Sequence, residues 1–166
     1  ATYDGKAHAA KGVTNKVTEE GIEVTAGENT YYVTGLKTED PEWKDAGTYS
    51  NNISGTAVVK DAAGNDVTSQ FNVKTVNGEL KINKAVVTLK SATLSKEYDG
   101  KALVNGETAL ETESGFAEGE GATYTFTGSQ TLVGTSNNAF SYTLKEGTKA
   151  ENYTINKTEG TLTVTN

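Results

Sequence analysis

The sequence predicts an all-β protein made of two tandem small β-sandwich modules joined by a short stiff connection. Three observations predict this class. Apolar and hydroxyl residues alternate with a period of two in several short segments, as they do in half-buried strands. Blocks of sequence recur once, in the same order. No window carries the 3.6-residue apolar period of an amphipathic helix, and a single helical turn at residues 41–46 is the only helix we expect.

The repeat is the strongest signal in the chain. Its best-defined block is Tyr-Asp-Gly-Lys-Ala, and three further blocks follow in both copies. Residues 3–7 of the first copy correspond to 98–102 of the second, and residues 30–35 correspond to 123–128. Residues 47–48 together with 50–52 correspond to 134–138, and residues 71–82 correspond to 153–164. We therefore expect a first module at residues 1–84 and a second at residues 85–166.

The expected strands follow from the alternation inside these blocks. Residues 123–127, 153–156 and 161–164 each alternate aromatic or aliphatic with hydroxyl or amide side chains. In the first copy, apolar residues at 71–73 and 80–82 flank Asn77-Gly78, a dipeptide suited to a tight hairpin turn. The spacing is longer in the first copy around residues 40–43 and 61–65, which predicts two extra loops on a shared framework.

The junction between the copies has no Gly-, Ser- or Pro-rich linker. Its apolar residues change phase, because Leu80 and Ile82 are even-numbered whereas Val87 and Leu89 are odd-numbered. A strand that faces one core and then another must change phase in this way. We expect a short, stiff connection at residues 83–86.

The first copy begins close to its Tyr-Asp-Gly block, whereas residues 85–97 precede the same block in the second copy. The first module is therefore expected to lack its first strand, as in an excised or processed piece, a view that the absent initiator Met also favours. Such a module has an open sheet edge that can pair with a neighbouring chain.

Composition excludes several classes of function. The chain has 15 basic residues, all Lys, and 22 acidic residues, a net charge of −7. A surface of this sign does not favour nucleic acid. No apolar run approaches the ~20 residues of a membrane span, so membrane insertion is not expected. With no Cys there is neither a disulfide nor a thiolate metal site.

The repeated blocks resemble the YDG/MBG-type, immunoglobulin-like repeats that occur in tandem in large bacterial cell-surface proteins. The Tyr-Asp-Gly opening, the Gly-Thr-x-Ser-Asn-Asn-like middle and the ending at residues 152–164 carry the resemblance. It implies an extracellular, cell-surface or cell-wall location and a structural role in an adhesin stalk, with an unknown host or matrix ligand of the parent protein.

A second resemblance concerns the fold. Residues 45–49, Asp-Ala-Gly-Thr-Tyr, match the Asp-x-Gly-x-Tyr of an immunoglobulin tyrosine corner, in which the Tyr hydroxyl bonds to backbone. Two further strands follow this motif where an immunoglobulin fold has one. A β-grasp-like module with one short helix is therefore the alternative architecture.

No residue pattern predicts an enzyme, a cofactor or a metal. His8 is the only His, and the carboxylates of residues 113–120 lie in a Gly- and Ser-rich loop. Asp61, Asn65 and Asp66 could offer oxygen ligands, but their spacing is not that of a Ca²⁺ loop. A covalent Lys–Asn isopeptide bond is a minor hypothesis for Lys90 with Asn152 or Asn156. This reaction needs an apolar pocket that keeps the Lys amine neutral.

The remaining candidate is a ligand surface formed by Trp43 and Tyr32. An aromatic ring can stack on a sugar, and Trp43 lies in an insertion that only the first copy has. The predicted function is that of a non-catalytic spacer. The alternative is a carbohydrate- or protein-binding module whose binding site is the Trp43 loop.

Overall fold

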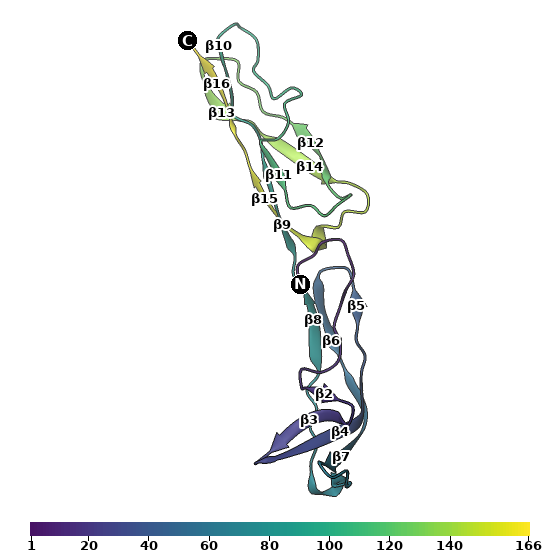
Figure 1. The fold of residues 1–166 in the computed structure, drawn as a ribbon. Coiled ribbons are helices and arrows are strands. Elements are labelled where there is room, and N and C mark those ends of the chain that lie inside the picture. Colours follow the sequence, from purple (N-terminus) through teal and green to yellow (C-terminus); the bar gives the residue numbers. More distant parts are fainter. The chain divides into compact units, whose positions relative to one another are not determined.

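The computed structural model describes residues 1–166 and confirms the all-β prediction (Figure 1). Its sheets are consistent with the β-sandwich class. The only helical segments are two 3-10 turns, Thr68–Gln70 and Ala150–Asn152. The expected helical turn at residues 41–46 is wrong: β5 (Glu42–Trp43) pairs there with β1 (His8–Ala9). No helix is long and apolar enough to cross a membrane.

The chain divides into two compact units. The N-terminal unit is Ala7–Ile82, and the C-terminal unit is Asn83–Asn166 together with Ala1–Lys6. The division after Ile82 lies two residues before the boundary expected from the repeat. Residues 1–6 therefore belong to the first repeat by sequence and to the C-terminal unit by packing.

The N-terminal unit has a four-stranded antiparallel sheet in the order β2-β3-β4-β7. Its strands are β2 (Val17–Thr18), β3 (Gly21–Ala26), β4 (Asn29–Thr38) and β7 (Ile53–Asp61). A second ladder joins β6 (Gly47–Asn51) to β8 (Gly78–Ile82). Val33 and Val59 pair across β4 and β7, and both are buried, as are Leu80 and Ile82 on β8.

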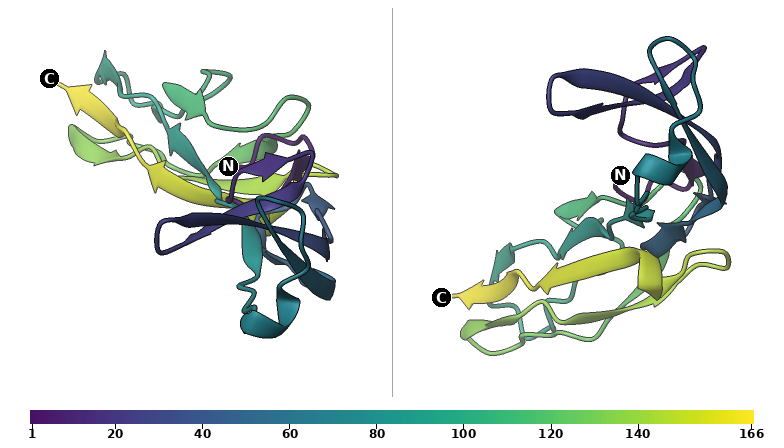
Figure 2. Two further views of the ribbon diagram at one scale, coloured as in Figure 1. Left: turned by 60° about the horizontal axis from the view of Figure 1, so that its bottom comes forward. Right: turned by 90° about the horizontal axis from the view of Figure 1, so that it is seen from below.

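The C-terminal unit has eight strands in three ladders. They are β9 (Ala85–Lys90), β10 (Leu94–Glu97), β11 (Thr112–Ser114), β12 (Ala122–Phe126), β13 (Gly134–Asn137), β14 (Phe140–Leu144), β15 (Tyr153–Thr158) and β16 (Thr161–Thr165). The ladders have the orders β11-β9-β15, β10-β16-β13 and β12-β14. The pairs β9–β15 and β10–β16 are parallel, and Figure 2 shows the yellow C-terminal strands beside the teal ones.

The change of apolar phase at the junction is confirmed. Leu80 and Ile82 are buried on β8, whereas Ala85, Val87 and Leu89 are the buried residues of β9. Val86, between them, is 58% exposed. Each strand therefore presents its apolar face to the core of its own unit.

The expected alignment of residues 30–35 with 123–128 is wrong, because Thr38 lies opposite Ile53 where Phe126 lies opposite Phe140. The ladders β6–β8 and β13–β16, in contrast, have the same register. Gly47 pairs with Ile82 and Tyr49 with Leu80, just as Gly134 pairs with Val164 and Ser136 with Leu162. From residue 47 onward, β6 of the first repeat therefore matches β13 of the second without a gap. This match pairs Asn51 with Asn138, so the sequence alignment of residues 50–52 with 136–138 is wrong by one position.

One contact is conserved between the repeats although its side chains differ. The Asn77 side chain accepts a hydrogen bond from the Ile53 N–H (2.8 Å), and the Glu159 side chain accepts one from the Phe140 N–H (3.0 Å). Any side-chain oxygen at this distance can accept a hydrogen bond from the N–H of the first residue of the strand. The sequence could not show this equivalence, because an amide replaces a carboxylate.

The expected strand at residues 71–73 and the hairpin at Asn77-Gly78 are wrong. Residues 71–77 form no strand, although the equivalent segment of the second repeat is β15. The physical reason is the partner: β15 lies in parallel against β9, and the first repeat has no strand equivalent to β9. Gly78 instead begins β8, whose ladder partner is β6.

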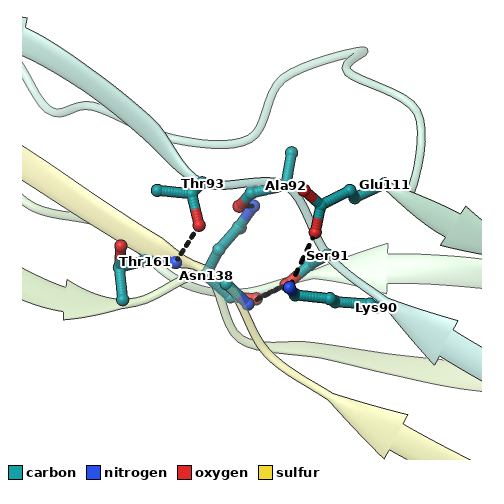
Figure 3. A network of polar contacts seen from close by, with 8 residues as sticks. Lys90, Ser91, Ala92, Thr93, Glu111, Asn138 and Thr161 are labelled. Atoms are coloured by element: carbon teal, nitrogen blue, oxygen red, sulfur yellow. Dashed lines mark hydrogen bonds and ion pairs between the residues drawn. The ribbon is translucent and has the colours of Figure 1, made fainter.

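Buried polar groups fix the point where the C-terminal unit changes from one ladder to the next (Figure 3). The Ser91 hydroxyl donates to the Asn138 carbonyl (2.7 Å) and accepts the Gly160 N–H (2.9 Å). The Asn138 side-chain amide donates to the Ala92 carbonyl (3.0 Å) and to the Asn105 side-chain oxygen (2.9 Å). These bonds hold the β9–β10 link against the β15–β16 link.

Candidate functional site

The best-defined cluster of side chains receives Tyr3. We call it the tyrosine seat; it consists of Phe116, Ala117, Glu120 and Tyr153. The Tyr3 ring packs edge-on against Tyr153, with centroids 5.4 Å apart, and Tyr153 packs in the same way on Phe116 at 5.3 Å. Tyr3 and Tyr153 are each 4% exposed. Edge-on packing of this kind adds about 0.5–1.5 kcal/mol to simple burial.

Hydrogen bonds complete the tyrosine seat. The two oxygens of Glu120 accept one tyrosine hydroxyl each, from Tyr3 (2.7 Å) and from Tyr153 (2.9 Å). The Tyr153 hydroxyl also accepts the Ala117 N–H (3.0 Å). Burial, and then the Glu120 carboxylate, raise the pKa of Tyr153, while the Ala117 N–H acts in the opposite direction. Both tyrosines thus serve as neutral donors to one carboxylate, an arrangement suited to fixing a segment in place.

Gly5 allows the Tyr3 segment to lie this close. Its φ is +77°, and a Cβ at this position would lie 3.2 Å from the Ala117 Cβ and 3.3 Å from a Glu120 oxygen. Glycine adopts such a backbone conformation at no steric cost. The Tyr-Asp-Gly block therefore has a physical role: Tyr enters the seat, and Gly turns the chain away beside it.

The second Tyr-Asp-Gly block has the same local geometry without a seat. Gly100 has a φ of +78°. The Asp99 carboxylate accepts the Lys101 N–H at 2.9 Å, as Asp4 accepts the Lys6 N–H at 2.9 Å. Tyr98, however, is 52% exposed. The same block is buried in one copy and presented to solvent in the other.

We predict that Tyr3→Phe lowers the free energy of unfolding of the C-terminal unit by about 1–2 kcal/mol. The change removes one donor to the Glu120 carboxylate and leaves the ring in place. The measurement is urea unfolding followed on NMR cross-peaks of β9 and β15. Tyr98→Phe is the matched control and should change stability by less than about 0.5 kcal/mol. Equal effects of the two substitutions would contradict a specific role for the seat.

The tyrosine seat also predicts loss of stability in alkali. Because the pKa of Tyr153 is higher in the folded than in the unfolded chain, its contribution is fully present below about pH 10 and disappears as the pH rises through the folded value. Thermal melts across this range should show Tm falling less steeply for Tyr153→Phe than for the wild type. If Tm fell equally steeply with pH in both proteins, Tyr153 would not be the source of the alkaline loss of stability.

The structure supports the tyrosine-corner comparison. The Tyr49 hydroxyl donates to the Asp45 carbonyl (2.9 Å), four residues earlier in the chain. Trp43 stacks flat on Tyr49, with ring centroids 4.6 Å apart and an interplanar angle of 4°. Trp43 nevertheless remains 51% exposed. The ring is therefore held in a fixed orientation while much of it faces solvent.

Tyr32 does not share a ring contact with Trp43. It lies on β4, paired with Glu23 on one side and with Lys60 on the other. Its neighbour Tyr31 packs edge-on against Phe71 at 4.7 Å. The ring that the structure brings to Trp43 is Tyr49, which sequence analysis had assigned to the corner alone.

The proposed isopeptide residues are placed as follows. The Lys90 amine forms an ion pair with Glu111 at 3.0 Å, and its side chain is 44% exposed. Thr158 is its partner on β15, Asn156 is opposite Thr88, and Asn152 is buried in the 3-10 turn. The reaction requires a buried, uncharged amine, and this exposed ion pair is not such an environment.

The oxygen-rich loop at residues 61–66 is a set of turn contacts. Asp61 accepts the backbone N–H groups of Ala63 and Asn65 and the side-chain amide of Asn65. Asp66 accepts the hydroxyl and the N–H of Thr68. These hydrogen bonds, led for Asp61 by those from Asn65, lower the pKa of both carboxyls. No group of three or more His, Cys, Asp or Glu side chains could hold a metal ion. His8 lies in β1, opposite Trp43.

Sequence analysis missed the tyrosine seat. It placed Glu120 in a Gly- and Ser-rich loop without a role, whereas two tyrosine hydroxyls hold the side chain. The repetition of Tyr-Asp-Gly was the available signal that this block makes a specific contact. Its partner could not be identified, because Tyr3 and Glu120 lie 117 positions apart in the chain.

Comparisons with known proteins identify no relative. No family model matches the chain, and no curated protein or solved structure matches it either.

Proposed function

We propose that this chain is a pair of non-catalytic structural modules from an extracellular bacterial surface protein, and that the modules act as spacers in an adhesin stalk. The observation that carries the proposal is the tyrosine seat. Tyr3 belongs to the first repeat by sequence, yet it is buried among residues of the second. A repeated block that docks into another repeat is what a chain of modules requires.

The local connection between the repeats supports the same role. Only Asn83 and Lys84 separate β8 from β9. Asn83 also donates its N–H to the Ala1 carbonyl and accepts the Tyr3 N–H, both at 2.8 Å. In the second repeat the Tyr98 N–H donates to Thr165, also at 2.8 Å. Each repeat thus places its Tyr-Asp-Gly block beside the end of its own last strand.

Surface display tests the spacer role. A small binding domain is fused to the end of the chain, and one or two tandem copies of the chain carry it on a bacterial surface. Spacer modules should make the domain more accessible to a large target with two copies than with one. A Gly/Ser linker with the same number of residues is the control, since a flexible coil lengthens only as the square root of its residue number. No gain from the second copy would contradict the proposal.

A carbohydrate- or protein-binding role for the Trp43 loop is the second candidate. One observation favours it: Trp43 is 51% exposed although Tyr49 fixes its ring. A preoriented aromatic face suits stacking on a sugar. Glycan-array binding by the wild type that is lost in Trp43→Ala, with the fold intact by circular dichroism, would support this role over a pure spacer. Binding that persists in Trp43→Ala would exclude this loop as the site.

A further inference from the structure

The Tyr-Asp-Gly block starts from the same point of its own repeat in both copies. Tyr3 donates its N–H to the carbonyl of Asn83, and Tyr98 donates its N–H to the carbonyl of Thr165, both at 2.8 Å. Asn83 and Thr165 are equivalent, because each directly follows the residue that pairs with the first glycine of β6 or of β13. The residue before each tyrosine pairs in parallel with the same acceptor residue. The two tyrosines therefore leave the backbone in the same register.

The two blocks differ in what covers them. Tyr3 is 4% exposed in the tyrosine seat, whereas Tyr98 is 52% exposed. A Cβ on Gly5 would lie 3.2 Å from the Cβ of Ala117, whereas a Cβ on Gly100 would meet no atom beyond its chain neighbours within 4 Å. The φ angles of the two glycines are nevertheless +77° and +78°. The second block thus has the local conformation of the docked block, with open space where the seat would lie.

The second block is also held in this conformation without a seat. The Lys96 amine lies 2.8 Å from the Asp99 carboxylate, which accepts the Lys101 N–H at 2.9 Å as well. A binding segment that is ordered before it binds loses less conformational entropy when it docks. The block is therefore ready for a partner.

Further apolar side chains are exposed at the same end of the C-terminal unit. β10 and β13 lie on either side of β16, the first parallel to it and the second antiparallel. Tyr98 follows β10, and Leu132 and Val133 precede β13, so all three lie where β16 ends. Leu132 and Val133 are 69% and 56% exposed. A group of exposed apolar residues at one end of a folded unit marks an interaction surface.

We propose that the second Tyr-Asp-Gly block is a docking element, and that its partner is the tyrosine seat of a further repeat of the C-terminal type. The Tyr98 hydroxyl would donate to the carboxylate equivalent to Glu120, and its ring would pack edge-on against the ring equivalent to Tyr153. Gly100 would lie against the equivalent of Ala117. The recognition is the same for a seat in the same polypeptide and for a seat in another one. The proposal rests on the proposed spacer function and names the contact that joins the spacers.

The residues of the seat define which repeats can be partners. In the seat the Tyr153 hydroxyl donates to Glu120 and accepts the Ala117 N–H. Its counterpart in the first repeat is Phe71, which has no hydroxyl and packs on Tyr31. The N-terminal unit therefore cannot offer this seat, and Tyr3 already fills the seat of the C-terminal unit. We accordingly expect no association of the natural chain with itself through Tyr98.

The test is a longer chain in which a second copy of residues 85–166 follows the last residue. Residues 165–166 are equivalent to residues 83–84, so the appended copy begins in the natural register and offers an empty seat. The appended copy carries Tyr98→Phe and Tyr142→Phe, so that each of these tyrosines occurs once. Nitration by tetranitromethane, read by peptide mass spectrometry, should be about tenfold slower at Tyr98 than in the natural chain. Nitration of Tyr142, which is 36% exposed on β14, should not change.

A matched pair of variants in the appended copy tests the seat itself. Glu120→Ala removes the carboxylate that receives the tyrosine hydroxyl and should restore the nitration of Tyr98. Glu118→Ala changes an exposed carboxylate two residues away and should leave Tyr98 protected. Equal nitration of Tyr98 in both variants would overturn the proposal.

Three further results would each decide against docking. The first is an unprotected Tyr98 beside an appended copy that is folded by its NMR cross-peaks. The second is an appended copy that does not fold, because a seat filled by Tyr98 should be as stable as the seat filled by Tyr3. The third is self-association of the natural chain that Tyr98→Ala abolishes. The spacer function stands apart: a gain of reach in surface display with an unprotected Tyr98 would retain the spacer role and exclude the docking contact.

Discussion

Gly160→Ala is expected to destabilise the C-terminal unit by about 3 kcal/mol. A Cβ on Gly160 would lie 2.4 Å from the Ala92 carbonyl oxygen and 2.5 Å from that of Ser91. Both oxygens belong to the buried link between β9 and β10, which the Ser91 and Asn138 hydrogen bonds hold in place. The backbone cannot yield without losing these bonds. Urea unfolding monitored on cross-peaks of Val87 and Leu162 measures the loss.

Gly78→Ala is the matched control, because Gly78 occupies the same position in the first repeat. The nearest atom to a Cβ at this site is the Asn51 Cβ at 4.0 Å, since no link equivalent to residues 91–92 lies above it. Gly78→Ala should be neutral or slightly stabilising, through the lower chain entropy of the unfolded state. A similar loss of stability in both variants would mean that the cost arises from the position in the strand and not from contact with the β9–β10 link.

Asn138→Ala is expected to cost about 3 kcal/mol, because it leaves one buried and one partly buried acceptor without their donor. The side-chain amide of Asn138, which is fully buried, donates to Ala92 and to Asn105. Asn105 is itself only 2% exposed, so water cannot replace the lost donor. The expected result is a lower urea midpoint with an unchanged m-value.

Its repeat counterpart, Asn51, supplies the comparison. The Asn51 side-chain oxygen accepts the Asp40 N–H at 2.8 Å, and the Asn51 amide lies 3.5 Å from the carboxylate of Asp40, an exposed residue. Asn51→Ala should therefore cost about 1 kcal/mol. A larger effect for Asn51 than for Asn138 would contradict the assignment of the buried network to the second repeat alone.

Local alternation predicted several of the strands. The aromatic-hydroxyl pattern of residues 123–127 and the ending at 161–164 correspond to β12 and β16. The same pattern failed at residues 71–73, because a strand needs a neighbour to pair with and the sequence of the segment itself cannot supply one. The failure therefore lies in a missing partner and not in the propensity of Phe71 and Val73.

The candidate site was harder to predict for a related reason. The expectation that Trp43 lies in an insertion of the first copy is wrong, because His8 pairs with Trp43 as Leu103 pairs with Gln130 in the second repeat. The stacking of Trp43 on Tyr49 could not be read from the sequence. The tyrosine seat joins residues from opposite ends of the chain. The repetition of Tyr-Asp-Gly indicated that this block makes a specific contact. Only the fold identifies Glu120 and Tyr153 as the partners of Tyr3.

Amide hydrogen exchange of the full chain, resolved by NMR, tests most directly whether one framework is built twice with one strand missing from the first copy. Exchange reports the local opening of hydrogen-bonded segments. We predict protection of β6 and β8 to match that of β13 and β16, and slow exchange along residues 154–158 with fast exchange along residues 72–76. Protection of residues 72–76 equal to that of residues 154–158, or protection of only one of the two matched strand pairs, would contradict this account.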